Sequence, residues 1–340
     1  MSIDYLALAN AGVEKLHPYQ PGKPVEELER ELGISNSVKL ASNENPLGLG
    51  PKAKAAIERV LPELARYPDA NGFALKTKLS EKLGVNTDQL ILGNGSNELI
   101  DLIYHTFVSP GQQVVFSQYT FIVYALATQA HGAKAVVVPA KDFGHDLDAM
   151  AAAITEQTKL VCITNPNNPT GTFLTKAELA AFLARVPEQV LVVLDEAYTE
   201  YVTEDEQPPS IDWLAQYPNL IVSRTFSKAY GLAGLRVGYM VAHPELIGVL
   251  NRVREPFNCN SLALAAAEAA LDDEAYLSEA VTLNRREMAR YEAFFQKLDL
   301  RYVPSRGNFI TLDLQRDAAP VYEALLREGV IVRPIAGYGF

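Results

Sequence analysis

The chain has 340 residues, of which 48% are hydrophobic and 21% are charged, and its formal net charge is −11. These values predict a globular protein with a large domain and a smaller companion. An acidic chain without a basic stripe offers no electrostatic basis for binding nucleic acid, and no stretch approaches 18 uninterrupted apolar residues, so no membrane span is expected. The two cysteines, Cys162 and Cys259, lack metal-ligand spacing and fit a reducing compartment, so we expect a cytoplasmic protein without a bound metal.

The first 35 residues are rich in turn formers, with a proline-rich run over residues 17–24 at their centre. Such a segment is a poor helix or core strand, so residues 1–35 are predicted to form an N-terminal arm that is ordered only by lying against something else. A polar turn follows at residues 40–48. Helices are then predicted over residues 51–65, with a proline in the first turn, and over residues 73–82.

Apolar runs alternate with helical patterns up to about residue 242. The predicted strands cover residues 89–92, 113–116, 135–138, 160–163, 190–194, 220–222 and 237–241. The helical patterns between them cover residues 97–108, 120–131, 146–154 and 175–185. Apolar strands separated by helices indicate a mainly parallel central sheet with helices on both faces, so we predict an α/β fold in which residues 36–245 form the large domain.

The pattern changes after this sheet. A long helical stretch over residues 244–297 is broken near residues 255–257 and 272–273. A strand, a helix and a second strand follow it, at residues 309–314, 318–327 and 330–332. We therefore predict a small C-terminal α/β domain over residues 246–340. The last residues are loop-like, so this domain is expected to be truncated.

Polar residues follow four of the apolar runs, and ligands of open α/β sheets bind beyond the carboxyl ends of the strands. Residues 93–97 open a helix with glycines, where backbone N–H groups can meet an anion, although such an entry is usually only a turn and an N-cap. The loop at residues 165–171 holds prolines and asparagines. An asparagine there could bond a ring oxygen, or the loop could be an ordinary rigid turn.

The other two runs end in charged residues. Asp195 closes a fully apolar strand, where a buried carboxylate needs a cation such as a protonated pyridine nitrogen, although it could instead cap a helix. Lys228 lies among hydroxyl residues, with Arg236 eight residues later. Lysine forms imines with aldehydes, and hydroxyls with a guanidinium suit a phosphate, although a lone lysine in a glycine-rich loop is usually a surface residue. The four strand ends together favour a pyridoxal phosphate site.

With these residues, the chain resembles the fold-type I pyridoxal-phosphate aminotransferases, and within them the histidinol-phosphate aminotransferase family, over nearly its whole length. The segments that carry the resemblance are His17–Pro24, Asn43–Pro46, Arg66–Pro68, Gly93–Ser96, Asn165–Gly171, Asp195–Tyr198, Arg224–Arg236 and Arg333–Pro334. The proline-rich run and the Asn-Glu-Asn-Pro turn are the segments most particular to this family. The resemblance implies that the large domain binds pyridoxal 5'-phosphate and that the protein is a homodimer.

The resemblance also implies a role for individual residues. Lys228 is expected to bond to the cofactor aldehyde and to move a proton at the substrate Cα, while Asp195 pairs with the pyridine nitrogen. Tyr198 and Asn168 are expected to bond the ring hydroxyl oxygen. The implied donors to the cofactor phosphate are Ser96, Asn97, Thr225, Ser227 and Arg236.

An aromatic side chain is expected to stack on the cofactor ring. The spacing favours Phe121, with Tyr119 as the reserve. The resemblance further implies that Tyr67 reaches the phosphate across a dimer interface. The residues expected on the substrate side are Tyr19, Asn43 and Arg333.

The implied activity is amino transfer from histidinol phosphate to 2-oxoglutarate, with ping-pong kinetics because the nitrogen stays on the enzyme between half-reactions. An aromatic amino acid aminotransferase and a threonine-phosphate decarboxylase have similar cofactor motifs and stay open. A non-catalytic cofactor-binding regulator would need a DNA-binding module, for which residues 1–35 are too short. The family places another substrate-binding arginine and a final helix beyond residues 337–339, so the given chain is expected to bind cofactor but to handle substrate poorly.

Overall fold

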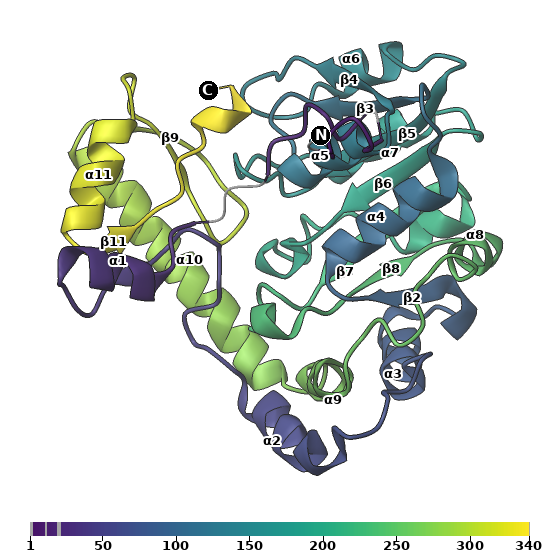
Figure 1. Ribbon diagram of the computed structural model, residues 1–340, viewed down its shortest axis with the longest axis horizontal. Coiled ribbons are helices and arrows are strands. Elements are labelled where there is room, and N and C mark those ends of the chain that lie inside the picture. Colours follow the sequence, from purple (N-terminus) through teal and green to yellow (C-terminus); the bar gives the residue numbers. More distant parts are fainter. Residues whose placement is uncertain (1–2, 11, 19–21, 340) are drawn as a thin grey trace.

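A seven-stranded sheet forms the centre of the computed structural model, which describes residues 3–10, 12–18 and 22–339. Its strands lie in the order β2-β8-β7-β6-β5-β3-β4 (Figure 1). They are β2 (Leu90–Gly93), β3 (Gln113–Ser117), β4 (Lys134–Val138), β5 (Thr158–Thr164), β6 (Leu191–Asp195), β7 (Leu220–Thr225) and β8 (Gly238–Val241). Strand β8 runs opposite to the other strands of this sheet, which all point the same way. This confirms the predicted mainly parallel sheet.

Helices cover both faces of this sheet. The helices α4 (Ser96–Phe107), α5 (Ile122–Ala130) and α8 (Pro244–Leu250) pack on one face. The helices α3 (Phe73–Leu83), α6 (Leu147–Ala152) and α7 (Lys176–Leu183) pack on the other. Along β5, Val161 and Ile163 belong to one core while Leu160 and Cys162 belong to the other, as the two-residue period of a strand requires. Each such side chain stabilises the fold by about 1.5–3 kcal/mol, which explains why the central strands are apolar throughout.

The N-terminal segment departs from the prediction. Helix α1 (Val25–Leu32) begins after Pro24 and ends at Gly33, whose φ of 65° is left-handed. Leu28, which is 1% exposed, packs with Ala41 and Ile331. The prediction of an arm without a helix is therefore wrong here, because the turn-forming composition of the preceding run masked a short amphipathic period.

The C-terminal part contains the long helices that the sequence predicted, with breaks where it predicted them. The helix α9 (Ser261–Ala270) packs against α2 (Pro51–Val60), which lies much earlier in the chain. Helix α10 (Glu274–Lys297) follows α9 after the break at Asp272 and Asp273. The remaining elements are β1 (Val38–Lys39), β9 (Arg301–Val303), β10 (Thr311–Asp313), α11 (Ala319–Arg327) and β11 (Val330–Ile331). Short 3-10 helices lie at Leu61–Glu63, Thr87–Gln89, Thr199–Tyr201, Asp212–Ala215, Ala233–Leu235 and Ala336–Tyr338.

Figure 1 shows α1, α10, α11 and β9 grouped beside the large sheet. β1 pairs in parallel with β11, so a segment near residue 38 joins a segment near residue 330. The predicted domain boundaries at residues 35 and 245 stay a prediction. Among the described residues, no helix combines the length and the apolar character that crossing a bilayer requires.

Candidate active site

A cavity of about 980 Å³ lies at the carboxyl ends of β5, β6 and β7. Parallel strands bring their carboxyl ends to one sheet edge, so residues distant in sequence meet there. The predicted site residues that line this cavity are Asn43, Ser96, Asn97, Phe121, Asn168, Asp195, Tyr198, Thr225, Ser227, Lys228, Arg236 and Arg333. The structure thus brings together twelve of the predicted residues around one space.

Lys228 follows β7 and extends into the cavity. Its Nζ donates to the backbone oxygen of Ser42 at 3.0 Å and lies 5.6 Å from the centre of the Tyr198 ring. The pKa of this amine is lowered to about 8, mainly by burial and also by nearby Arg236, while the carboxylates of Glu44 and Asp195 oppose the shift. A buried amine with a lowered pKa is a nucleophile near neutral pH.

Asp195 ends β6 and is 4% exposed. Its Oδ2 accepts a hydrogen bond from the Tyr124 hydroxyl at 3.0 Å, and its Oδ1 accepts one from the backbone N–H of Ala197 at 3.1 Å. Burial raises the pKa of the Asp195 carboxyl to about 6, and the two hydrogen bonds oppose this shift. Because ionising a buried carboxyl needs an opposite charge, the position suits a cationic ring nitrogen.

Tyr198 joins two amide side chains at one point. Its hydroxyl oxygen accepts hydrogen bonds from Asn43 Nδ2 and from Asn168 Nδ2, each at 3.0 Å. Burial raises the pKa of the Tyr198 hydroxyl above its ordinary value, so the group stays protonated at neutral pH. Tyr198 therefore keeps a proton to donate to an oxygen in the cavity, next to the amide of Asn168.

A cluster of donors lies at the start of α4. Gly95, at φ 79°, precedes the helix, and a Cβ at this position would come within 2.5 Å of Arg236 Nη2, so the guanidinium needs the glycine. Arg236 Nη1 contacts Ser227 Oγ at 3.5 Å, and the backbone N–H of Ser227 donates to Thr225 Oγ1 at 3.1 Å. A helix N-terminus, two hydroxyls and a guanidinium form a phosphate site.

These groups fit pyridoxal phosphate, because the same cavity presents phosphate donors, a buried carboxylate for a cationic ring nitrogen, and an amine for an aldehyde. The fit rests on the donor set itself: the Gly95 cradle would be filled by any larger residue, and the buried Asp195 has no cation at hydrogen-bond distance among the residues that the structure describes. The φ of 79° at this position, which residues other than glycine rarely adopt, explains why the sequence places glycine there.

The remaining predicted residues fall in different places. Phe121 lines the cavity, whereas Tyr119 does not and its ring lies parallel to that of Phe143 at 6.2 Å. Tyr67 is 82% exposed, stacks on Phe257 at 4.7 Å and is not among the lining residues. Tyr19 lies outside the described residues.

Tyr124 was missed by sequence reasoning. It lies one helical turn beyond Phe121, and this spacing was the available signal, since residues three apart share a helix face. What the sequence could not give is the partner of its hydroxyl, because Tyr124 meets Asp195 only once α5 packs on the sheet.

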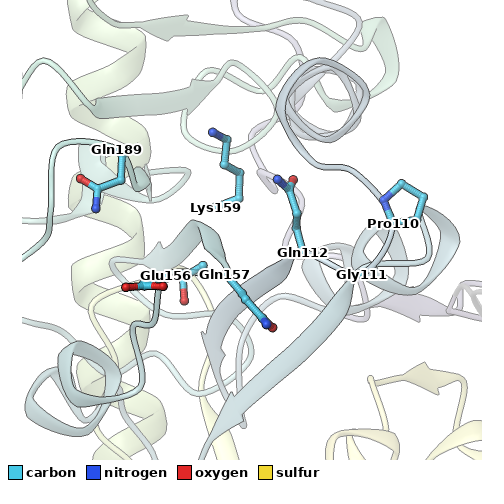
Figure 2. A pocket seen from close by; sticks show the side chains of 8 residues that line it. Pro110, Gly111, Gln112, Glu156, Gln157, Lys159 and Gln189 are labelled. Atoms are coloured by element: carbon cyan, nitrogen blue, oxygen red, sulfur yellow. The ribbon is translucent and has the colours of Figure 1, made fainter.

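A second hollow of about 470 Å³ lies near the opposite edge of the sheet, at the amino ends of β3 and β5 (Figure 2). Its lining is mainly polar, and its charged side chains are Glu156 and Lys159. It offers no buried carboxylate and no phosphate cradle.

Comparisons with known proteins agree with this site. The family model "aminotransferase class I and II" matches residues 35–340. The chain is 61% identical to histidinol-phosphate aminotransferase 1 of Mannheimia succiniciproducens, covering 98% of this chain and 92% of that protein. It is 60% identical to histidinol-phosphate aminotransferase 2 of Pseudomonas aeruginosa, covering 99% and 92%.

Solved structures agree as well. The histidinol-phosphate aminotransferase of Sinorhizobium meliloti in complex with pyridoxal-5'-phosphate superposes with a TM-score of 0.89 at 32% identity, covering 96% of this chain and 89% of that one. The predicted family resemblance, fold type and cofactor are confirmed by these matches. The chain therefore belongs to the aminotransferase class I and II family and, at these identities, to its histidinol-phosphate aminotransferases, and it is an enzyme that uses pyridoxal 5'-phosphate.

Proposed function

We propose that this enzyme transfers the amino group of histidinol phosphate to 2-oxoglutarate in histidine biosynthesis. The observation that carries the proposal is the meeting of Lys228, Asp195 and the Arg236 cradle in one cavity. The names of relatives at 61% and 60% identity support the choice of amino donor. An aromatic amino acid or threonine phosphate is the alternative donor.

When bound, pyridoxal phosphate provides an aldehyde for the donor amine and a ring that accepts electron density. Lys228 Nζ removes the proton from the substrate Cα and returns it at the next step, which its lowered pKa permits near neutral pH. Asp195 would hold its negative charge for the ring nitrogen. Tyr198 and Asn168 would orient the ring through its hydroxyl oxygen, and Phe121 is the aromatic side chain of the lining that would hold the ring.

The phosphate groups need cationic partners. The α4 N-terminus, with Ser96 and Asn97, would hold the cofactor phosphate together with Arg236 and the hydroxyls of Thr225 and Ser227, all of which line the cavity. On the substrate side, Arg333 lines the same cavity and is the cation we assign to the substrate phosphate, and Asn43 also lines this cavity.

The test of the donor is a titration of the cofactor-loaded enzyme. Histidinol phosphate is expected to discharge the visible cofactor band with a kcat/KM about 10²-fold or more above phenylalanine, because phenylalanine has no phosphate for the partly buried Arg333. Threonine phosphate is the matched control, since it carries a phosphate without an imidazole. Initial rates against both substrates should give parallel double-reciprocal lines.

Other outcomes would replace the proposal. A preference for phenylalanine would favour an aromatic aminotransferase, and carbon dioxide release from threonine phosphate would favour a lyase. Intersecting double-reciprocal lines would contradict the ping-pong order.

We also propose a homodimer. Apolar side chains are exposed near Tyr67, and contiguous exposed apolar surface marks an interaction site. These side chains are Leu61, Leu64, Phe73 and Phe257, with exposed fractions of 42–72%. A second copy would cover this surface and bring the Tyr67 hydroxyl to the phosphate of the neighbouring site.

For the dimer, Tyr67→Phe is expected to weaken cofactor binding about 10-fold through the loss of one hydrogen bond to a charged group, without changing the dimer mass in solution. Mixed dimers of a Tyr67→Phe chain with a Lys228→Ala chain provide the control. In a mixed dimer, one site combines Lys228 of the Tyr67→Phe chain with Tyr67 of the Lys228→Ala chain, so it has both native residues. This half of the sites should bind cofactor as tightly as wild type. A monomeric mass, or no restored sites, would contradict the arrangement.

We further propose that residues 36–245 act as the large cofactor-binding domain, with residues 246–340 as the smaller one, and that the protein works in the cytoplasm. Both cysteines are free and buried, which fits a reducing compartment. Limited proteolysis tests the boundaries, and cell fractionation tests the location. A cleavage pattern without a boundary near residue 245, or a secreted protein, would contradict these proposals.

A further inference from the structure

Tyr124 places a polar group deep in the core below the cavity. It is fully buried in the first turn of α5, in the core cluster that contains Phe116, Cys162 and Val193. Its backbone oxygen accepts a hydrogen bond from Thr128 Oγ1 at 2.7 Å. A buried hydroxyl needs a partner, and the partner of this one is Asp195 Oδ2, at 3.0 Å.

The contact fixes the orientation of the Asp195 carboxylate. Oδ1 accepts from the backbone N–H of Ala197 and Oδ2 accepts from Tyr124, so each oxygen has one hydrogen bond and the carboxylate cannot rotate without breaking both. Each oxygen keeps a lone pair for a further donor. Because α5 is anchored in the core, Tyr124 transmits the position of that helix to the carboxylate.

We propose that Tyr124 is a positioning residue of the aminotransferase reaction, orienting the Asp195 carboxylate and keeping it ionised for the ring nitrogen of pyridoxal phosphate. The inference rests on the proposed role of Asp195. Tyr124 itself touches neither substrate nor cofactor, because its side chain is not among those that line the cavity.

The groups that face Asp195 define the sign of the effect. Burial and the Glu196 carboxylate raise the pKa of Asp195, whereas Tyr124, the Ala197 N–H and the Lys228 ammonium lower it. Burial also raises the pKa of the Cys162 thiol and of the Tyr198 hydroxyl, so both are neutral at pH 7. Losing the Tyr124 hydroxyl therefore moves the Asp195 pKa upward, toward a protonated carboxyl that no longer pairs with a cation.

The first experiment uses the enzyme without added cofactor. Infrared difference spectra between pH 4 and 9 follow the protonated carboxyl band assigned through Asp195→Asn. Tyr124→Phe is expected to raise the midpoint by about one pH unit, the effect of one hydrogen bond to a charged group. Tyr104→Phe is the matched control, since Tyr104 is equally buried and its hydroxyl contacts Thr128 and the Tyr124 backbone but not Asp195.

The second experiment uses the loaded enzyme. Tyr124→Phe is expected to lower kcat about 10-fold with KM for the amino donor within about twofold, because the hydroxyl acts on the ring and not on substrate binding. In an Asp195→Asn background the same change should have no further effect on kcat. Thermal unfolding of each variant separates lost folding from lost positioning.

Two results would overturn the inference: an unshifted carboxyl midpoint in a folded Tyr124→Phe enzyme, or an equal loss of kcat in Tyr104→Phe. The infrared result does not require cofactor or turnover. A shifted midpoint in an enzyme that fails to transaminate would therefore contradict the proposed function while leaving the Tyr124–Asp195 contact intact.

Discussion

Replacing Lys228 by alanine is expected to lower kcat/KM for transamination about 10⁴-fold, because the variant loses the amine that moves the Cα proton. The variant should still bind pyridoxal phosphate through the Arg236 cradle, but without the visible band of the covalently held cofactor. Absorbance spectra and initial rates on the same samples measure both effects.

Lys39 provides the control, since it is another lysine of the cavity lining and pairs with Glu44 at 2.9 Å near the rim. Lys39→Ala should change the rate by no more than about fivefold, the effect of a partly exposed ion pair. Equal losses in both variants would contradict the assignment, because the effect would then not be specific to Lys228.

The pH dependence of cofactor attachment in the wild-type enzyme provides a second readout of the same residue. Only the neutral amine attacks an aldehyde, and burial lowers the Lys228 pKa to about 8, so the attachment rate should rise as pH increases through 8 and then level off. With an ordinary exposed lysine, the attachment rate would rise only near pH 10 to 11. A midpoint in that higher range would show that Lys228 is not the reacting amine.

Replacing Asp195 by alanine is expected to lower kcat about 10²–10³-fold, because removing one member of a buried ion pair leaves the cationic ring nitrogen without its counter-charge. Asp195→Asn keeps hydrogen-bonding atoms but removes the charge, so it should lose nearly as much. Steady-state rates with saturating cofactor measure the effect.

Asp273 offers a matched control, because it is 5% exposed, like Asp195, and accepts a hydrogen bond from the backbone N–H of Lys52. Asp273→Asn should lower the thermal midpoint while leaving kcat within about twofold, since a buried substitution away from the active site acts mainly on stability. If Asp195→Asn retained wild-type kcat, the charge of Asp195 would not be needed.

The sequence allowed prediction of most strands and of the residues at their carboxyl ends. Asp195 and Lys228 could be found because each follows an apolar run directly, so local pattern alone places it at the sheet edge. The partners of these residues could not be found in this way. The contact of Asn43 with Tyr198 and that of Tyr124 with Asp195 depend on how distant elements pack.

The elements that the sequence did not predict are short and lie outside the sheet. Helix α1 follows a proline-rich run, and strands β1 and β9 are too short for a two-residue period to be recognised. Their existence depends on tertiary contacts, such as the packing of Leu28 against Ile331, which no local pattern contains.

The pairing of β1 with β11 also fixes the order in which parts of the chain can assemble during synthesis. Residues 38–39 leave the ribosome about 290 residues before their partners at residues 330–331. At about 5–20 residues per second, the early segment waits on the order of tens of seconds with Leu28 uncovered. The central sheet from β2 to β8 can form during that interval. Translation speed and chaperone access should therefore affect the pairing of β1 with β11 more than the folding of the central sheet.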